Sequence, residues 1–302
     1  MKILIAGATG AIGKPLIGFL QEQGHTLWGI TQSQERAKGL EEQGAQGVIL
    51  DVLDQSAVFS AVAKIKPDIL IDMLTHLPKE YTPQAMQEAA SLDAKIRIEG
   101  GANLLAAAEK EKVKRTIVQS AAFWYAPGNG LADETVPFAF EAPLGIALGS
   151  KRCQEIEQRA LRSSLDAIAL RFGFFYGPGT WFSPEGNIGD QVRRGQFPIE
   201  GSGTGIWNFI HIEDAAKAIV LALEAASGCY NIVNDTPISL AAWLPAFAKT
   251  LQAPPPPYLT AEEAVEQRGE ETLYYATRLR GATNAKAKQI FSFSPRPFNY
   301  GL

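Results

Sequence analysis

Short apolar runs alternate with longer stretches of helical periodicity through the first half of the chain. Residues 2–6 are continuously apolar, which is typical of a strand buried on both faces of a parallel sheet. Residues 11–23 follow with the periodicity of a helix. The same alternation predicts further strands at residues 26–31, 47–50, 68–73 and 115–120, and helices at residues 34–43, 55–65 and 83–111. Five strands with helices between them predict an α/β fold with a doubly wound parallel sheet.

The second half of the chain continues this alternation and then changes in composition. The pattern predicts a helix at 150–162, a strand at 166–172, a loop rich in Pro, Gly and aromatic residues, a strand at 207–210 and helices at 213–225, 240–251 and 284–290, with a short strand at 229–233. We therefore predict a large domain of residues 1–172, joined by residues 207–226. The rest of residues 173–302 would form a smaller C-terminal α/β substrate-binding region.

Composition and charge exclude several classes of protein. The chain has 302 residues, 46% of them hydrophobic and 20% charged, as in a globular protein. No apolar run approaches the roughly 20 residues of a membrane span. A net charge of −4 argues against nucleic-acid binding. Two cysteines and three scattered histidines predict neither a disulfide framework nor a metal site. The first residues lack the pattern of a secretory signal, so we expect a cytoplasmic protein.

A glycine-rich turn, GATGAIG, joins the first predicted strand to the first predicted helix. The first glycine of such a turn permits a tight bend, the second lets the backbone approach a pyrophosphate, and the third lets helix and strand pack closely. The helix N-terminus adds unpaired amides and a partial positive charge. The position directly after a buried strand makes the motif specific. It predicts a Rossmann fold and a dinucleotide bound by Gly7, Thr9, Gly10, Ala11, Ile12 and Gly13.

The end of the second predicted strand bears on which dinucleotide binds. A carboxylate there would accept from the ribose hydroxyls of NAD and repel the 2′-phosphate of NADP. The sequence instead has Thr31, Gln32 and Ser33, with Arg36 just downstream. We therefore expect NADP as cofactor and keep NAD as the alternative, since Arg36 could equally be a solvated helix residue.

Two further segments are expected to line the cofactor. Asp51 ends the third predicted strand beside Val52, and its carboxylate could accept from the adenine amino group. The alternative role of Asp51 is to cap the next helix, which Asp54 could also do. Leu74 and Thr75 follow the fourth predicted strand, where a cofactor would run.

Several stretches together resemble the extended short-chain dehydrogenase/reductase superfamily, in its NAD-dependent epimerase/dehydratase branch. They cover nearly the whole chain and comprise the GATGAIG turn and residues 51–53, 100–105, 171–179 and 208–216. The resemblance implies a nicotinamide cofactor and an oxidoreductase or epimerase activity. It also implies that Phe174 lies on the stretch that passes the nicotinamide.

The catalytic residues depart from the family pattern. The family uses Tyr-x-x-x-Lys, in which the lysine lowers the tyrosine pKa and the tyrosine exchanges a proton with substrate. The matching stretch has Ala147 in place of the tyrosine and keeps Lys151, while Ala121 stands at the position of the family's catalytic hydroxyl. The candidates for proton transfer are therefore Lys151, Tyr125, Ser120 and Tyr176, with Ser120 and Lys151 also contacting cofactor. Aromatic packing is the alternative role of both tyrosines.

Three functions remain open on this basis. The first is an NAD(P)-dependent oxidoreductase that acts on a small, partly hydrophobic carbonyl or hydroxyl compound with a non-standard proton donor. The second is a catalytically silent protein that senses NADP(H). The third, a nucleotide-sugar epimerase or dehydratase, is less favoured because few cationic residues are available for a sugar diphosphate. The predicted helices 83–111 and 150–162 could pair two copies in a homodimer.

Overall fold

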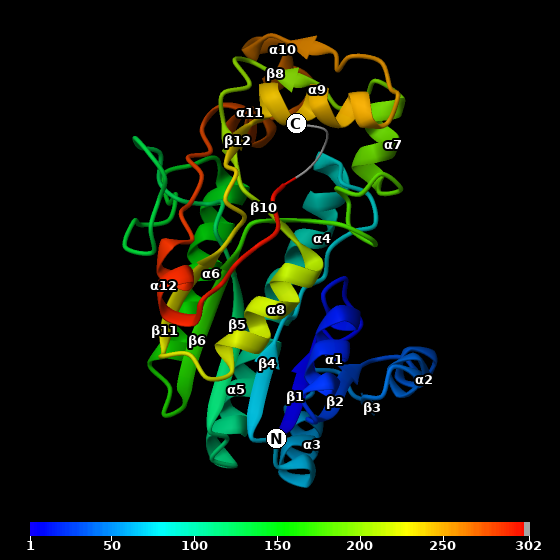
Figure 1. Cartoon of the computed structure of the whole chain (residues 1–302), viewed down its shortest axis with the longest axis vertical. Coiled ribbons are helices and arrows are strands. Elements are labelled where there is room, and N and C mark those ends of the chain that lie inside the picture. Colours follow the sequence, from blue (N-terminus) through cyan, green and yellow to red (C-terminus); the bar gives the residue numbers. More distant parts are fainter. Residues whose placement is uncertain (299–302) are drawn as a thin grey trace.

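One large parallel sheet organises the chain, for which a computed structural model describes residues 1–298 (Figure 1). Its seven strands run in the order β11-β6-β5-β4-β1-β2-β3, and every neighbouring pair is parallel. The strands are β1 (Lys2–Ala6), β2 (Thr26–Thr31), β3 (Gln46–Ile49), β4 (Ile69–Asp72), β5 (Arg115–Ala121), β6 (Asp166–Phe172) and β11 (Gly228–Ile232). The order reverses between β1 and β4, which is where doubly wound sheets bind ligands. The predicted Rossmann-type fold is confirmed.

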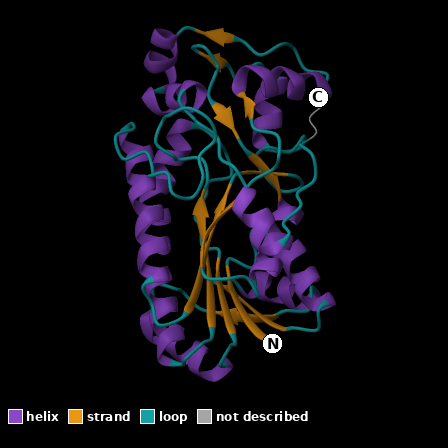
Figure 2. Ribbon diagram, turned by 60° about the vertical axis from the view of Figure 1, so that its left-hand side comes forward, coloured by secondary structure: helices purple, strands orange, loops and turns teal. Residues whose placement is uncertain are grey.

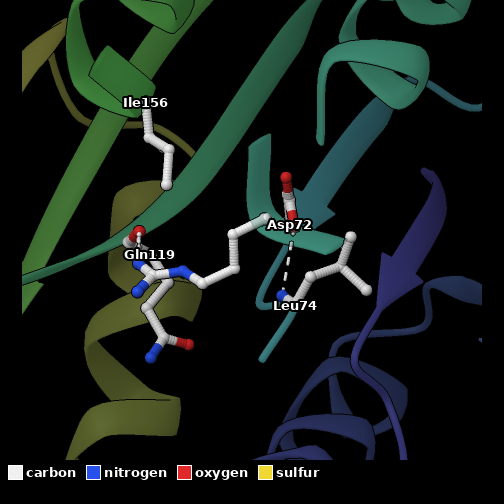
Figure 3. A pocket seen from close by; sticks show the side chains of 5 residues that line it. Asp72, Leu74, Gln119 and Ile156 are labelled. Atoms are coloured by element: carbon white, nitrogen blue, oxygen red, sulfur yellow. Dashed lines mark hydrogen bonds between the residues drawn. The ribbon is translucent and has the colours of Figure 1, made fainter. Parts of the chain in front are cut away.

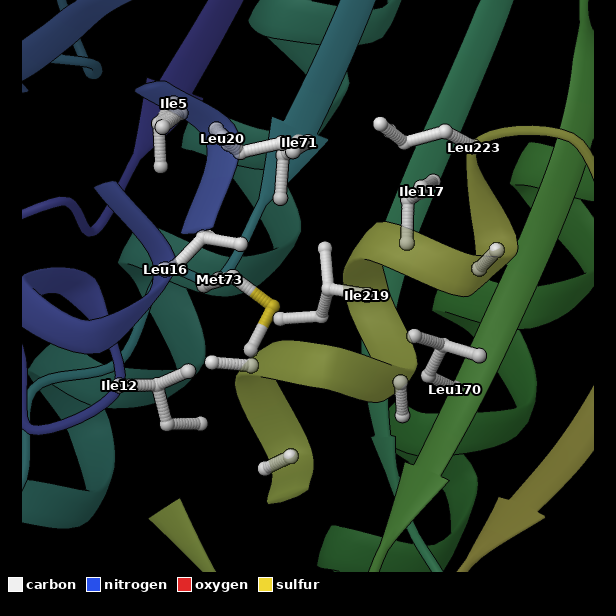
Figure 4. Close-up of a cluster of buried hydrophobic side chains, with 14 of the residues drawn as sticks. Ile5, Ile12, Leu16, Leu20, Ile71, Met73, Ile117, Leu170, Ile219 and Leu223 are labelled. Carbon is white, nitrogen blue, oxygen red and sulfur yellow. The ribbon is translucent and has the colours of Figure 1, made fainter. Parts of the chain in front are cut away.

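Helices cover both faces of this sheet. One face packs against α1 (Gly13–Glu22), α2 (Gln34–Glu42), α8 (Ile212–Ala222) and α12 (Ala285–Phe291). The other face packs against α3 (Gln55–Ile65), α5 (Gly101–Lys110) and α6 (Leu144–Leu161). Within β4, Ile71 joins the first core (Figure 4). Leu70 joins the second core, so the strand is buried on both sides as its apolar run predicts.

The predicted helix at 83–111 forms with one irregularity in its middle. It comprises α4 (Pro83–Lys95), a π-helical turn η1 (Ile96–Gly100) and α5. Thr82 caps its start, because the side chain accepts from the Ala85 amide, and Pro83 occupies the first turn, where a missing N–H costs nothing. A Cβ on Gly100 would lie 2.7 Å from Cγ2 of Val52, so this part of the helix lies directly against the segment after β3.

Two sequence predictions need correction. The strand predicted at 229–233 fell within the smaller region, yet β11 pairs with β6 along its whole length and forms the edge of the large sheet. An isolated short apolar run does not show which sheet it joins. The helix predicted at 150–162 begins earlier, at Leu144, because Pro143 is the residue that interrupts the preceding chain.

The remaining elements lie beyond the carboxyl ends of the sheet strands (Figure 2). They are β7 (Phe174–Tyr176), α7 (Asn187–Arg193), β8 (Ile199–Glu200), β9 (Ile206–Trp207), β10 (Phe209–His211), β12 (Ile238–Ser239), α9 (Leu240–Thr250), β13 (Tyr258–Leu259), α10 (Ala261–Arg268) and α11 (Glu270–Thr277). A third core rich in aromatic residues, with Trp243 and Phe247 fully buried, holds them together. No helix within residues 1–298 has the length and apolarity needed to cross a bilayer.

Candidate functional site

The turn after β1 has the geometry that its glycines predict. Gly7 has φ of +85°, and a Cβ there would lie 2.5 Å from the carbonyl oxygen of Met73. The Gly10 amide donates to the Gly7 carbonyl at 3.0 Å. A Cβ on Gly13 would lie 1.8 Å from the Ala8 carbonyl oxygen, so only glycine lets α1 start this close to β1.

The N-terminus of α1 is open toward solvent. Thr9, Gly10 and Ala11 are exposed, while Ile12 and Gly13 are buried. Ile12 stands at the N-cap and provides no side-chain cap, while the Gly13 amide donates to the Gly10 carbonyl at 2.9 Å. The positive dipole end of α1 and the exposed backbone of this turn fit a diphosphate. Ile12 itself packs in the core, and only its backbone faces this end.

The end of β2 offers a cation and no carboxylate at the predicted position. Thr31 is buried and its Oγ1 accepts from the Ser33 amide at 3.3 Å. Ser33 caps α2 by accepting from the Arg36 amide. The side chains of Gln32 and Arg36 are exposed, so the guanidinium stands at the helix start where an anion would be bound.

The segment after β3 keeps the carboxylate of Asp51 at the surface. Its Oδ1 accepts from the Leu53 amide at 3.0 Å. Asp54 caps α3 through the Ala57 amide, so the alternative capping role belongs to Asp54 and not to Asp51. Val52 is buried, and its carbonyl accepts from Nδ2 of Asn103 on α5.

The buried carboxylate of Asp93 links the segment after β4 to α6. Asp93 on α4 accepts from the His76 amide at 2.7 Å and pairs with Arg152 of α6 at 2.7 Å. Leu74 is half-buried here and Thr75 is exposed. Leu74 lines a shallow hollow with Arg97 and Asp72, whose Oδ1 accepts from the Leu74 amide at 3.1 Å (Figure 3). Burial raises the pKa of the Asp72 carboxyl.

Tyr125 belongs to a buried polar network and not to an open site. Its hydroxyl donates to Oδ1 of Asn231 at 2.6 Å and accepts from Nη1 of Arg171 at 2.8 Å. Arg171 in turn makes two hydrogen bonds to the carboxylate of Glu157, at 2.7 and 2.6 Å. Burial raises the pKa of Tyr125 to about 12. Because both bonding directions of the hydroxyl are used inside the protein, the structure does not bring Tyr125 to substrate.

Ser120 and Tyr176 are both buried in the structure. Ser120 lies opposite Arg171 in the sheet register and is 2% exposed, on the face covered by α6. Tyr176 packs edge-on against His211 and Phe298, with ring centroids 5.0 and 5.2 Å away, and burial raises its pKa to about 12. Aromatic packing, which was the alternative role of Tyr176, is what its contacts show.

One face of α6 lies against the end of β5 and the loop that follows it. Cys153, which is fully buried, packs against Ala121 at the end of β5. One turn earlier, a Cβ on Gly149 would lie 2.5 Å from the benzene ring of Trp124, in the loop after β5. Lys151 is exposed, and within residues 1–298 it has no ion-pair partner. Ala147, which the resemblance matches to the family's tyrosine, is buried, so this position of α6 carries a methyl group and no hydroxyl.

An aromatic cluster, defined as Phe123, Trp124, Phe174, Trp207 and Tyr275, lies against this face. Phe174 stacks between Phe123 and Trp207, with ring centroids 4.4 and 4.3 Å away. Nε1 of Trp124 donates to the hydroxyl of Tyr275 at 2.7 Å. Of this cluster the sequence indicates Phe174, which lies in the stretch 171–179 that resembles the family. It gives no sign of Tyr275, which lies in a distant helix outside any motif.

Comparison with known proteins decides the family. A family model described as the NAD dependent epimerase/dehydratase family matches residues 3–234. The chain belongs to this family. It is 36% identical to a 3-diazoavenalumate denitrifying reductase of a Streptomyces species, over 98% of this chain and 96% of the relative. It is 26% identical to a 2-alkyl-3-oxoalkanoate reductase of Stenotrophomonas maltophilia, over 80% and 72% of the two chains.

Solved structures in the family share the fold. The crystal structure of Thermus thermophilus UDP-glucose 4-epimerase in complex with NAD covers the whole of this chain with a TM-score of 0.70 and 20% identity, and 96% of that chain is matched. The resemblance to the extended short-chain dehydrogenases/reductases is confirmed. This member of the family keeps the glycine turn. Alanine stands at both positions, Ala121 and Ala147, that the resemblance matches to the family's proton-transfer residues.

Proposed function

We propose that this chain is an NAD(P)H-dependent reductase that reduces an aromatic diazonium compound without a protein acid. The observation that carries the proposal is that Ala147 and Ala121, which the resemblance matches to the family's proton-transfer residues, are both buried and carry only methyl groups. A methyl group cannot protonate a substrate oxygen. The glycine turn and the open N-terminus of α1 nevertheless fit a dinucleotide.

The chemistry of the substrate explains how such a site can work. When bound, a reduced nicotinamide supplies hydride. A ketone that accepts hydride also needs a proton on its oxygen, which the family's tyrosine provides. An aryl diazonium ion needs no proton: its carbon gains a C–H bond, the C–N bond breaks, and its electron pair leaves with dinitrogen. Charge balances, because a cation and a hydride give two neutral products.

In this reaction the protein binds the substrate's aromatic ring and excludes water from it. Phe174 is stacked on Phe123 and Trp207 and is buried with Trp207, so the half-buried rings of Phe123 and Trp124 supply the aromatic surface that suits a flat, electron-poor or cationic ring. The relative at 36% identity is named for the reductive denitrification of a diazo substrate, and it matches nearly the whole chain. This agreement supports a diazo substrate over the sugar nucleotides named for the structural neighbours, which match at far lower identity.

The test is a comparison of substrate classes with purified protein and NADPH. We expect NADPH oxidation with benzenediazonium, with benzene and dinitrogen formed in equal amounts, and rates at least about a hundredfold lower with ketones and aldehydes, which need an acid. Oxidation of NADPH by ketones alone would contradict the proposal. Tight NADPH binding with no turnover of either class would favour a sensor.

We further propose that NADP is preferred over NAD. Arg36→Ala is expected to raise the dissociation constant of NADPH about tenfold or more, because the exposed guanidinium would lose its charge-assisted bonds to the 2′-phosphate. The affinity for NADH should stay within about twofold, since NADH lacks that phosphate. Lys38→Ala, on the same exposed helix, is the control. Equal losses for both nucleotides in Arg36→Ala would contradict this assignment.

A homodimer built on α4 and α6 also remains a proposal. Leu144 and Leu148 of α6 are 74% and 50% exposed, and Leu92 of α4 is 42% exposed. Apolar side chains of this size on neighbouring helices suit an isologous helical interface. Sedimentation of the purified protein, with a Leu148→Glu variant as comparison, decides between monomer and dimer.

A further inference from the structure

Two hydrogen bonds, one at its hydroxyl and one at its backbone carbonyl, hold Tyr275 in a fixed position. Its hydroxyl accepts from Nε1 of Trp124 at 2.7 Å. Its backbone carbonyl accepts from Nε1 of Trp207 at 3.2 Å. One turn earlier on α11, Glu271 accepts from the Gly145 amide at the start of α6 at 2.7 Å. These bonds join α11 of the smaller region to both the aromatic cluster and α6.

The hydroxyl of Tyr275 keeps its proton available. Because it accepts from Trp124, its own O–H points elsewhere, and no acceptor for that proton lies within residues 1–298. The rings of Phe174 and Trp207 flank it, with centroids 6.1 and 6.0 Å away. Burial raises the pKa of Tyr275 well above 10, so the group is a hydrogen-bond donor at neutral pH.

Trp124 connects this donor to the middle of α6. The benzene edge of its indole meets the position where a Gly149 side chain would begin, and its pyrrole nitrogen meets Tyr275. The Tyr275 hydroxyl therefore stands one indole ring away from α6, among aromatic rings.

We propose that Tyr275 determines substrate specificity by donating a hydrogen bond to an oxygen substituent on the substrate's aromatic ring. The proposal rests on the proposed diazonium reductase function and deepens it. Tyr275 binds and orients the ring; it transfers no proton in the reaction. Trp124 is a positioning residue, since its indole N–H fixes the direction in which the tyrosine hydroxyl can donate.

The experiment compares Tyr275→Phe with Tyr274→Phe, using 3- and 4-carboxybenzenediazonium and unsubstituted benzenediazonium as probes. Tyr274 is the matched control because it lies on the same helix, is buried, and has a hydroxyl without a partner in the described part of the chain. We expect Tyr275→Phe to lower kcat/KM about tenfold for at least one carboxylated probe, mainly through KM, as loss of one good hydrogen bond would. Benzenediazonium should be unaffected within about twofold.

A binding measurement separates this proposal from the proposed function. Calorimetric titration with benzoate in the presence of NADP⁺ should show affinity about tenfold weaker in Tyr275→Phe than in the unaltered protein or Tyr274→Phe. Trp124→Phe should give a smaller loss, because Tyr275 keeps its hydroxyl but loses its fixed direction. Equal benzoate affinity in all variants would overturn the role of Tyr275. If benzoate binding depends on Tyr275 while no diazonium ion is reduced, only the reductase function fails.

Discussion

Glu157→Ala is expected to lower the free energy of unfolding by about 3–5 kcal/mol, because it leaves the guanidinium of Arg171 charged and unpaired inside the protein. The side chains of Glu157 and Arg171 are 5% and 8% exposed, and two hydrogen bonds join them. The same change removes the partner that orients Arg171 toward Tyr125. Urea denaturation followed by circular dichroism measures the effect.

The loss of stability in Glu157→Ala is compared with the losses expected in Glu155→Ala and Tyr125→Phe. Glu155→Ala on the same helix removes a pair 3.8 Å long whose carboxylate is 57% exposed, and should cost about 0.5 kcal/mol or less. Tyr125→Phe removes one hydroxyl from the network and should cost about 1–3 kcal/mol while leaving NADPH turnover intact. A loss of turnover without a loss of stability in Tyr125→Phe would restore this tyrosine as a proton donor.

Gly10→Val is expected to weaken NADPH binding by about a hundredfold or more, with little change in folding. Gly10 is exposed, and a Cβ there would have only the Gly7 carbonyl oxygen nearby, at 3.2 Å. The turn must give slightly at this one close contact, and the added side chain extends from the surface that a diphosphate must approach. Calorimetric titration with NADPH measures the affinity, and thermal unfolding without nucleotide measures the fold.

Gly18→Ala is the matched control on α1, since a Cβ there has nothing within 4 Å. It should leave NADPH affinity unchanged and stabilise the helix by about 0.5–1 kcal/mol. Unaltered NADPH binding in a folded Gly10→Val protein would show that the turn after β1 does not hold the diphosphate.

The fold was predictable because its signals are local. Buried parallel strands such as β1 and β4 need apolar residues on both faces, and the glycine turn needs its glycines for contacts with Met73 and Ala8 that few other residues permit. The place of β11 was not predictable in the same way. Its five residues look the same whether they extend the large sheet or a small one, and only pairing with β6 decides.

The glycine turn of the candidate site was predictable from the sequence, while the roles of the site residues stay predictions. A lysine at the family's spacing matched Ala147 and Lys151 to the proton-transfer pair, and the structure buries Ala147 and exposes Lys151. Sequence spacing shows which residues share a face of α6, and only the fold shows what that face packs against. Tyr275 lies about 120 residues after Lys151 in the sequence. Only the folded chain brings it into the aromatic cluster.

The most direct test of the account uses NADPH carrying deuterium at the transferable position of its nicotinamide. Reduction of benzenediazonium in ordinary water is followed by mass spectrometry of the benzene formed. The account predicts one deuterium per molecule of product, because hydrogen arrives as hydride and no protein group or solvent proton forms the C–H bond. Benzene that carries hydrogen from water instead would contradict a hydride transfer that needs no acid.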